Sequence, residues 1–384
     1  MIHLEKLEQA RRLVAASDLD VWLTFVRETT ALCDPVLPLI CDFGMTFAVV
    51  GNYDADAVRQ LGGWNQVVPY VHSIKDRLVA VLELTIPTSV AKPRIGINTC
   101  EWDDKADGIT LGMFHLLSSM LEGTRFAGCL VSASDVVIPL RAQKTESELD
   151  AIEDAIQVTE GIFDWLTSTF VQVGMTEFQI YRGIQTLIDE RGYGYGWERA
   201  GNPIVNCGPD SQAGHGLPSN QIALEHGHIL HIDLGVATRN YSSDIQRCWY
   251  VGTFVPEHIQ KAMAAVVSAI DAAAAVLRPG VQGWMVDAAA REAITAAGYP
   301  EYMHAVGHQV GRFAHDGGTL LGPQWERYGN APDGFVEARE VYTLELGIEL
   351  PHAGVVSIEE MVIVTATGCE FLTDRQTEMW LLQR

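Results

Sequence analysis

Hydrophobic and polar positions alternate along the first third of the chain in a way that predicts an α/β unit. Residues 2–16 place leucine, alanine and valine at helical spacing, which predicts an amphipathic helix. Short apolar runs, which we interpret as strands, follow at 21–26, 45–50 and 78–86, with helical stretches between them. This alternation predicts a first domain over residues 1–135.

The pattern changes at a polar, charged segment over residues 139–150. Thr145 with Glu148 three residues later fits a capping box, so a long helix is predicted over 146–172. Further helical patterns cover 176–191, 256–277 and 283–297. These features predict a second domain over residues 136–384.

Within the second domain, residues 229–251 predict two strands joined by a polar turn at Thr238-Arg239-Asn240. Asp233 and Asp244 are equally distant from the middle of that turn, so a simple hairpin places them directly opposite each other. Their neighbours are apolar, and two like charges in a buried position repel. Either the two carboxyl groups share a proton or a cation lies between them.

Residues 341–365 predict a second hairpin that turns at Pro351-His352-Ala353-Gly354. Its register makes Glu345 face Glu359, although Glu360 fits almost as well. Between the two hairpins, His304, His308 and His315 lie within twelve positions. Four carboxylates and an imidazole suit a pair of manganese, cobalt, iron or zinc ions. The alternative is a set of carboxyl groups that burial keeps neutral.

Charge and composition restrict the partners. The 384 residues carry 49 acidic and 26 basic side chains, a formal net charge of −23, which argues against nucleic acid or an anionic membrane as the main partner. We find no signal-peptide pattern and no apolar run that reaches the length of a membrane span. The seven cysteines form no CxxC pair, which is typical of a reduced, cytoplasmic protein.

These motifs resemble those of the pita-bread metallopeptidases (family M24), which include methionine aminopeptidases, Xaa-Pro aminopeptidases, prolidases and the metal-free creatinases. The segments that carry the resemblance are His231-Ile-Asp233-Leu-Gly235, Ser243-Asp244-Ile-Gln-Arg247, Gly307-His308-Gln-Val-Gly311, His315-Asp316, Thr343-Leu-Glu345-Leu-Gly347 and Ile358-Glu359-Glu360. The segment from Arg141 to Glu148 and the N-terminal unit resemble the prolidase branch. Leu346 and Ser357 depart from the family's frequent Glu-Pro-Gly and from its arginine before the last glutamate motif.

The resemblance implies a fold and a ligand set. The fold is α/β (α+β), with a creatinase-like accessory domain over 1–135 followed by a pita-bread catalytic domain over 136–384. The resemblance favours Glu359 over Glu360 as a metal ligand. Asp233 would chelate one divalent ion, His308 with Glu345 would chelate the second, and Asp244 with Glu359 would bridge the two. The implied assembly is a homodimer.

The resemblance also implies an activity, the hydrolysis of N-terminal Xaa-Pro bonds in dipeptides or short peptides by a hydroxide held between two metal ions. Glu345 would carry the proton to the leaving nitrogen, and His215 and His315 would lie beside the scissile carbonyl. The five implied ligands and the two histidines are all present, which argues against a metal-free, creatinase-like site. Two alternatives stay open: another amide hydrolase of this fold that acts on a small metabolite, and a non-catalytic binding protein.

The long loop over 316–340 is rich in glycine and proline and carries Trp325, Arg327 and Tyr328. Loops of this length are often binding elements, so we expect this loop to shape the substrate pocket or a dimer contact. The alternative is a simple surface excursion.

Overall fold

The computed structural model describes residues 2–26, 39–41, 44–212, 214 and 216–383. The chain divides into two units, residues 1–141 and 142–384, and each has its own hydrophobic core. The helix α5 (Ser134–Ala142) packs Val136, Val137 and Leu140 into the first core, so this unit extends past residue 135. The accessory and catalytic roles of the two units stay predictions.

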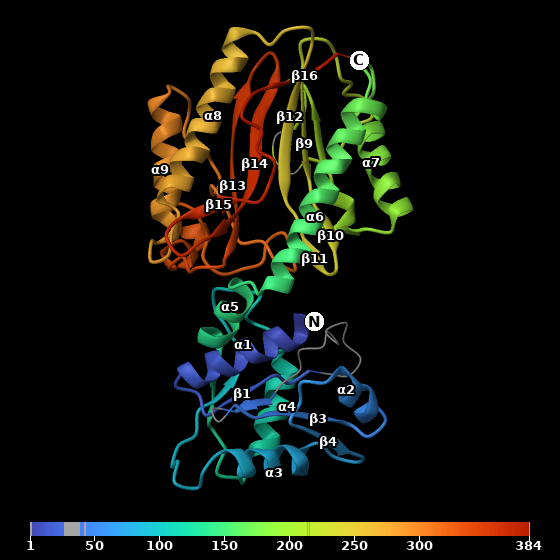
Figure 1. Cartoon of the computed structure of the whole chain (residues 1–384). Helices are drawn as coiled ribbons and strands as arrows, with labels where there is room; N and C mark the ends of the chain where they lie inside the picture. Colours follow the sequence, from blue (N-terminus) through green and yellow to red (C-terminus); the bar gives the residue numbers. More distant parts are fainter. Residues whose placement is uncertain (1, 27–38, 42–43, 213, 215, 384) are drawn as a thin grey trace. The chain divides into compact units, whose positions relative to one another are not determined.

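The first unit is an α/β structure built on a six-stranded sheet in the order β4-β3-β2-β1-β5-β6 (Figure 1). The pairs β1–β5, β3–β4 and β5–β6 are parallel, whereas β2 is antiparallel to both of its neighbours. The strands are β1 (Val21–Leu23), β2 (Leu39–Cys41), β3 (Thr46–Gly51), β4 (Gln66–Tyr70), β5 (Ile95–Ile97) and β6 (Leu130–Ser132). The other helices are α1 (Ile2–Ala16), α2 (Ala55–Leu61), α3 (Lys75–Thr85) and α4 (Leu111–Leu121).

One expected strand of the first unit is a helix. The apolar run at 78–86 belongs to α3, whose buried residues are Leu78, Val81, Leu82 and Thr85. Their spacing of three and four residues places them on one face of a helix, with polar side chains between them. A run this short does not distinguish a buried strand from a buried helix by hydrophobicity alone.

The second unit begins with two helices that the sequence predicts correctly. In α6 (Glu146–Trp165) the Thr145 hydroxyl accepts from the Glu148 amide, and the Glu148 carboxylate accepts from the Thr145 amide. The helix continues as one π-helical turn, η1 (Leu166–Phe170). A second capping box, built on Thr176, starts α7 (Glu177–Arg191). These caps satisfy amide groups that a helix start would otherwise leave unpaired.

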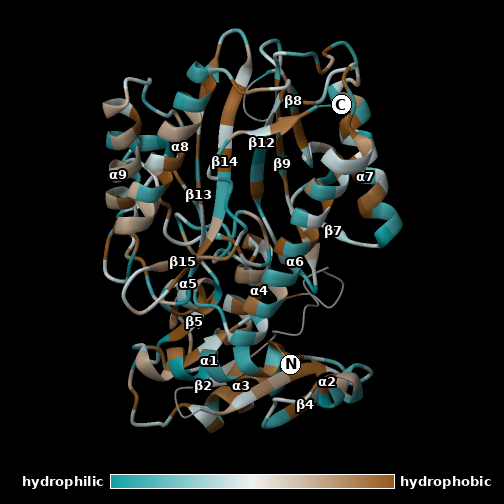
Figure 2. Cartoon of the chain, turned by 45° about the horizontal axis from the view of Figure 1, so that its top comes forward, coloured by the Kyte–Doolittle hydropathy of each residue, from teal (hydrophilic) through white to brown (hydrophobic). Residues whose placement is uncertain are grey.

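The main sheet of this unit runs in the order β13-β14-β12-β9-β8, with β15 beside β14 and β16 beside β12. In Figure 1, α8 and α9 lie on the side of β13 and β14, and α6 and α7 lie on the side of β9 and β10. Figure 2 shows hydrophobic residues along the strands, interrupted by hydrophilic positions on β9 and β14. The elements are β7 (Gly194–Tyr195), β8 (Ile204–Cys207), β9 (Ile229–Leu234), β10 (Val236–Thr238), β11 (Tyr241–Ser242), β12 (Ile245–Val251), β13 (Val341–Leu350), β14 (Gly354–Val364), β15 (Cys369–Phe371), β16 (Trp380–Leu382), α8 (Glu257–Val276) and α9 (Gly283–Ala296).

The expectation that no apolar run reaches the length of a membrane span is wrong, because helix α8 is long and apolar enough to cross a membrane by length and composition alone. In the fold, however, its buried face packs with α9, β13 and β14 in the core of the second unit. Core helices of globular proteins commonly have this composition, because their apolar face covers a sheet. The helix therefore serves as the cover of the β13–β14 pair that carries two of the predicted ligands.

Candidate metal centre

Asp233 lies on β9, and its direct partner on β12 is Gln246 rather than Asp244. The expectation that the two aspartates are directly opposed is therefore wrong by two residues. The cause is the turn, which consists only of Arg239 and Asn240, both with positive φ (50° and 64°). Two-residue turns of this kind match the right-handed twist of the strands that they join.

Asp244 reaches Asp233 nevertheless, because it lies in an interruption of the strand just before β12 begins. Its carboxyl group is hydrogen-bonded to that of Asp233. At the same interruption, Gly235 packs so closely on Ser243 that a Cβ atom at position 235 would lie 2.3 Å from the carbonyl oxygen of Ser243. Only glycine permits this approach, so the local pinch that brings the aspartates together depends on it.

Glu345 on β13 and Glu359 on β14 are direct cross-strand partners, which confirms the predicted register of the second hairpin. Successive residues on a strand point to opposite faces. Glu360 accordingly lies on the other face, where its Oε2 atom is 2.9 Å from the Arg247 guanidinium. The geometry therefore brings Glu359, not Glu360, to the side of the aspartates.

His308 completes the cluster from the loop before β13. Its Nε2 atom lies 3.5 Å from Glu345 Oε1, 3.7 Å from Asp244 Oδ2 and 3.8 Å from Glu359 Oε1. The donor atoms of Asp244, His308 and Glu359 all lie within 4.8 Å of one another. Two hydrogen bonds between Thr343 and the backbone of His308 fix the histidine to β13. The arrangement is of the kind that can hold a metal ion.

Burial dominates the electrostatics of this cluster. Desolvation raises the pKa of Asp233 to about 8 and that of Glu345 to about 7. It also raises the pKa of Asp244 and Glu359 well above the usual range, with the neighbouring carboxyl groups adding to the effect. Desolvation, followed by the charge of a second histidine, lowers the pKa of His308 to about 3. The imidazole is therefore neutral, as a metal ligand must be.

The residues of the cluster fit a divalent cation. Oδ1 of Asp233 is buried and has no hydrogen-bond partner within the described part of the chain. The nearby Arg247 guanidinium is engaged by Glu360 and by backbone carbonyl groups. Buried carboxylates are stable as anions only when a positive charge compensates them. Four carboxylates and a neutral imidazole are the donor set that divalent transition metals prefer.

The three histidines outside this ligand set differ in position. The ring of His315 lies 4.1 Å from that of His308, centroid to centroid, and the residue is exposed. His304 is also exposed, and its ring lies beside that of Tyr302. His215 lies outside the described residues, and its predicted role is considered below.

Sequence reasoning missed one residue of the site. The side-chain amide of Gln246 donates to Glu345 Oε2 at 2.9 Å and to Glu359 Oε2 at 3.0 Å. Gln246 is a buried polar residue on β12, next to the buried Arg247 and two positions after Asp244. Such a residue needs a hydrogen-bond partner, and that requirement was the available signal.

The loop over 316–340 packs against the segment that precedes His308. Trp325 and Tyr328 stack with ring centroids 6.0 Å apart, and the guanidinium of Arg291 lies 5.1 Å from the Trp325 ring. The hydroxyl of Tyr328 accepts from the amide of Ala305 at 3.1 Å. The role of this loop in a substrate pocket or a dimer contact stays a prediction.

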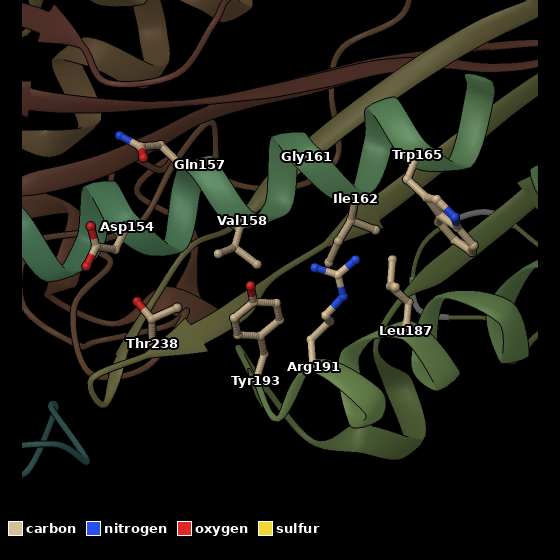
Figure 3. A pocket seen from close by; sticks show the side chains of 10 residues that line it. All are labelled: Asp154, Gln157, Val158, Gly161, Ile162, Trp165, Leu187, Arg191, Tyr193 and Thr238. Atoms are coloured by element: carbon tan, nitrogen blue, oxygen red, sulfur yellow. The ribbon is translucent and has the colours of Figure 1, made fainter. Parts of the chain in front are cut away.

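A separate groove of about 500 Å³ lies between α6 and α7 (Figure 3). Its wall on α6 includes Asp154, Val158 and Trp165, and Arg191 and Tyr193 face them from the end of α7 and the residues after it. None of the five predicted ligands lines this groove. The groove is thus distinct from the carboxylate and histidine cluster.

Comparison with known proteins agrees with this geometry. The model of metallopeptidase family M24 matches residues 150–366. An Xaa-Pro dipeptidase of Pyrococcus furiosus is 30% identical over 247 residues, which cover 64% of this chain and 67% of that protein. An Xaa-Pro dipeptidase of Pyrococcus horikoshii is 29% identical over 247 residues, 64% of this chain and 66% of that protein. The chain therefore spans about two thirds of the length of these relatives.

Solved structures match nearly the whole chain. An X-Pro aminopeptidase from Thermotoga maritima has a TM-score of 0.71 at 23% identity, covering 98% of this chain and 99% of that one. An Xaa-Pro dipeptidase from Bacillus anthracis has a TM-score of 0.74 at 24% identity, again covering 98% and 99%. At this level of identity the likeness shows the fold, which is the α/β unit followed by a pita-bread unit.

Fold, cluster and family model together define a metallopeptidase. The chain belongs to metallopeptidase family M24.

Proposed function

We propose that the chain hydrolyses N-terminal Xaa-Pro bonds in dipeptides or short peptides with the help of two divalent ions. The observation that carries the proposal is the convergence of four carboxyl groups and the neutral imidazole of His308 at one place in the second unit. The names of the two Pyrococcus relatives support the Xaa-Pro substrate class.

Five residues would hold the ions. Asp233 would bind one ion, His308 and Glu345 the second, and Asp244 and Glu359 both. This ligand set suits manganese, cobalt, zinc or iron. Bound divalent ions supply an activated water molecule as the nucleophile and a Lewis acid for the carbonyl oxygen.

Glu345 is the ligand that we assign to proton transfer. Its side chain is 17% exposed, whereas that of Glu359 is 2% exposed, so Glu345 is the more accessible of the two to a substrate. In the reaction, the water oxygen forms a bond to the carbonyl carbon and the bond from that carbon to nitrogen breaks. The leaving nitrogen of an Xaa-Pro bond carries no hydrogen and needs a proton to depart. Glu345 accepts the proton of the water and delivers it to this nitrogen.

His315 and His215 complete the proposal. The exposed ring of His315 adjoins His308, and we assign to it a hydrogen bond to the carbonyl oxygen on which negative charge develops. The same role is proposed for His215 on the basis of the resemblance alone. A homodimer and a cytoplasmic location are further parts of the proposal, and light scattering of the purified protein tests the first.

The decisive experiment is a panel of Xaa-Pro dipeptides with matched dipeptides that lack proline, assayed with manganese or cobalt and with a chelator. We expect turnover of the Xaa-Pro substrates that the chelator abolishes. Hydrolysis of small amides without hydrolysis of any dipeptide would favour the alternative of an amide hydrolase. A protein that binds metal and cleaves nothing would be a binding protein, and the proposal would fail.

A further inference from the structure

Gln246 forms hydrogen bonds with two carboxyl groups of the cluster, those of Glu345 and Glu359. Its side-chain nitrogen donates to Oε2 of Glu345 and to Oε2 of Glu359. The remaining oxygen of each group, Oε1, is the atom that lies close to Nε2 of His308, at 3.5 and 3.8 Å. The Gln246 amide thus holds one oxygen atom of each carboxyl group, and the other oxygen atom of each faces the imidazole of His308.

The amide oxygen of Gln246 also has polar neighbours, Ser357 and His231. Its Oε1 atom accepts from the hydroxyl of Ser357 at 2.8 Å and lies 3.1 Å from Nε2 of His231. The other ring nitrogen of His231 is 2.9 Å from Oδ1 of Asn206 on β8. A flipped amide would direct its oxygen at Oε2 of both glutamates, and ionised carboxylates can only accept hydrogen bonds. These partners therefore select a single orientation.

We propose that Gln246 is a positioning residue for the metal ions, acting through Glu345 and Glu359 and held in place by Ser357 and His231. The inference rests on the metal centre of the proposed function and adds to it the residue that orients two of the ligands. Hydrogen bonds from such a neighbour hold a ligand in its binding orientation before the ion arrives. Loss of the amide frees both carboxyl groups to rotate.

The chain offers a matched control in Gln376. This residue is also a buried glutamine, and its side chain bonds the backbone of β12, where it accepts from the amide of Cys248 and donates to its carbonyl group. Its amide group contacts the backbone of the strand and not the carboxyl cluster. Gln376→Met therefore removes a comparable buried amide and tests the structural effect alone.

The test is titration of the metal-free full-length protein with Co²⁺. Calorimetry measures the affinity, and the visible absorption spectrum reports the coordination of the bound ion. We expect Gln246→Met to weaken cobalt binding by about 10- to 100-fold and to change the spectrum, because neighbours of this type contribute that much to affinity. Gln376→Met should lower the melting temperature and leave both cobalt measurements at their wild-type values. Wild-type affinity and spectrum in Gln246→Met would overturn the inference, as would an equal loss of affinity in both variants.

A second variant keeps the test decisive when Gln246→Met does not fold. Ser357→Ala removes one of the groups that hold the amide, and we expect severalfold weaker cobalt binding with a shifted spectrum. An unchanged spectrum and affinity in that variant would then contradict the inference. Failure of the wild-type protein to bind cobalt is a different result, because it removes the proposed metal centre rather than the role of Gln246.

Discussion

Glu345 and Glu359 face each other directly across β13 and β14, inside an unbroken register that runs from Val341–Ile363 to Leu350–Gly354. Like charges in this arrangement destabilise a sheet. Both side chains are largely buried, and burial raises the pKa of each carboxyl group. The hairpin therefore becomes stable with two ionised glutamates only when cations bind beside them. This relationship gives the metal centre measurable effects on stability as well as on activity.

Replacement of Asp244, one of the two proposed bridging ligands, should abolish the metal centre. In Asp244→Asn the neutral amide cannot bridge two cations, so we expect turnover of Xaa-Pro dipeptides to fall by more than the roughly 100-fold that loss of an outer neighbour causes. Metal content per chain, measured by elemental analysis after dialysis, should fall in parallel. Full activity with full metal content in this variant would reject the bridging role of Asp244.

The metal-free protein should lose stability as the pH rises. Asp233 and Glu345 have folded-state pKa values of about 8 and about 7, above those of the unfolded chain, so the folded protein holds protons that the unfolded chain has released. The free energy of unfolding therefore decreases between about pH 4 and about pH 8. Bound cations replace these protons and should remove most of the decrease.

Thermal melting of the chelated and the manganese-loaded protein at acidic and alkaline pH measures this effect. The expected result is a gap between the two melting temperatures that widens toward alkaline pH. A gap that is constant across the range would show that the carboxyl groups are not protonated in the metal-free fold.

The buried pair of Arg247 and Glu360 should be important for stability. Arg247 is 1% exposed and donates to Glu360 and to three backbone carbonyl groups, which joins β12 to β14. Arg247→Met leaves a buried, unpaired carboxylate and should cost about 3–5 kcal/mol in urea unfolding. The double variant with Glu360→Gln should recover part of this loss. The exposed pair of Lys261 and Glu257 is the control, and Lys261→Met should change stability by less than about 1 kcal/mol.

The close approach of Gly235 to Ser243, beside the two aspartates, should leave no room for a side chain at position 235. Gly235→Ala brings a Cβ atom to 2.3 Å from the carbonyl oxygen of Ser243, so the strand must shift. We expect a loss of about 1–3 kcal/mol in unfolding free energy together with a lower metal content. At Gly161, inside α6, a Cβ atom meets nothing within 4 Å, so Gly161→Ala should be neutral or stabilising by about 0.5–1 kcal/mol. Equal stability and metal content in the two variants would contradict this account.

Local patterns in the sequence were sufficient for several parts of this structure. The capping box of Thr145 and Glu148 predicted where its helix begins, because a cap is a contact between residues three positions apart. The register of Glu345 and Glu359 followed from a single turn, since antiparallel pairing extends any turn symmetrically. The presence of acidic residues in apolar strands predicted a site that needs positive charge.

Contacts between distant segments decided the rest. The turn at Arg239 and Asn240 moved the cross-strand partner of Asp233 from Asp244 to Gln246. The close approach of Gly235 to Ser243 accompanies the contact between the Asp244 and Asp233 carboxyl groups, which no pattern in the strand itself indicates. The amide of Gln246 became part of the site only when β12 came to lie between β9 and β14. The sequence determined which chemical groups are present and which elements carry them. Tertiary packing alone determined which oxygen atoms meet, because those distances depend on strands that fold together from opposite ends of the second unit.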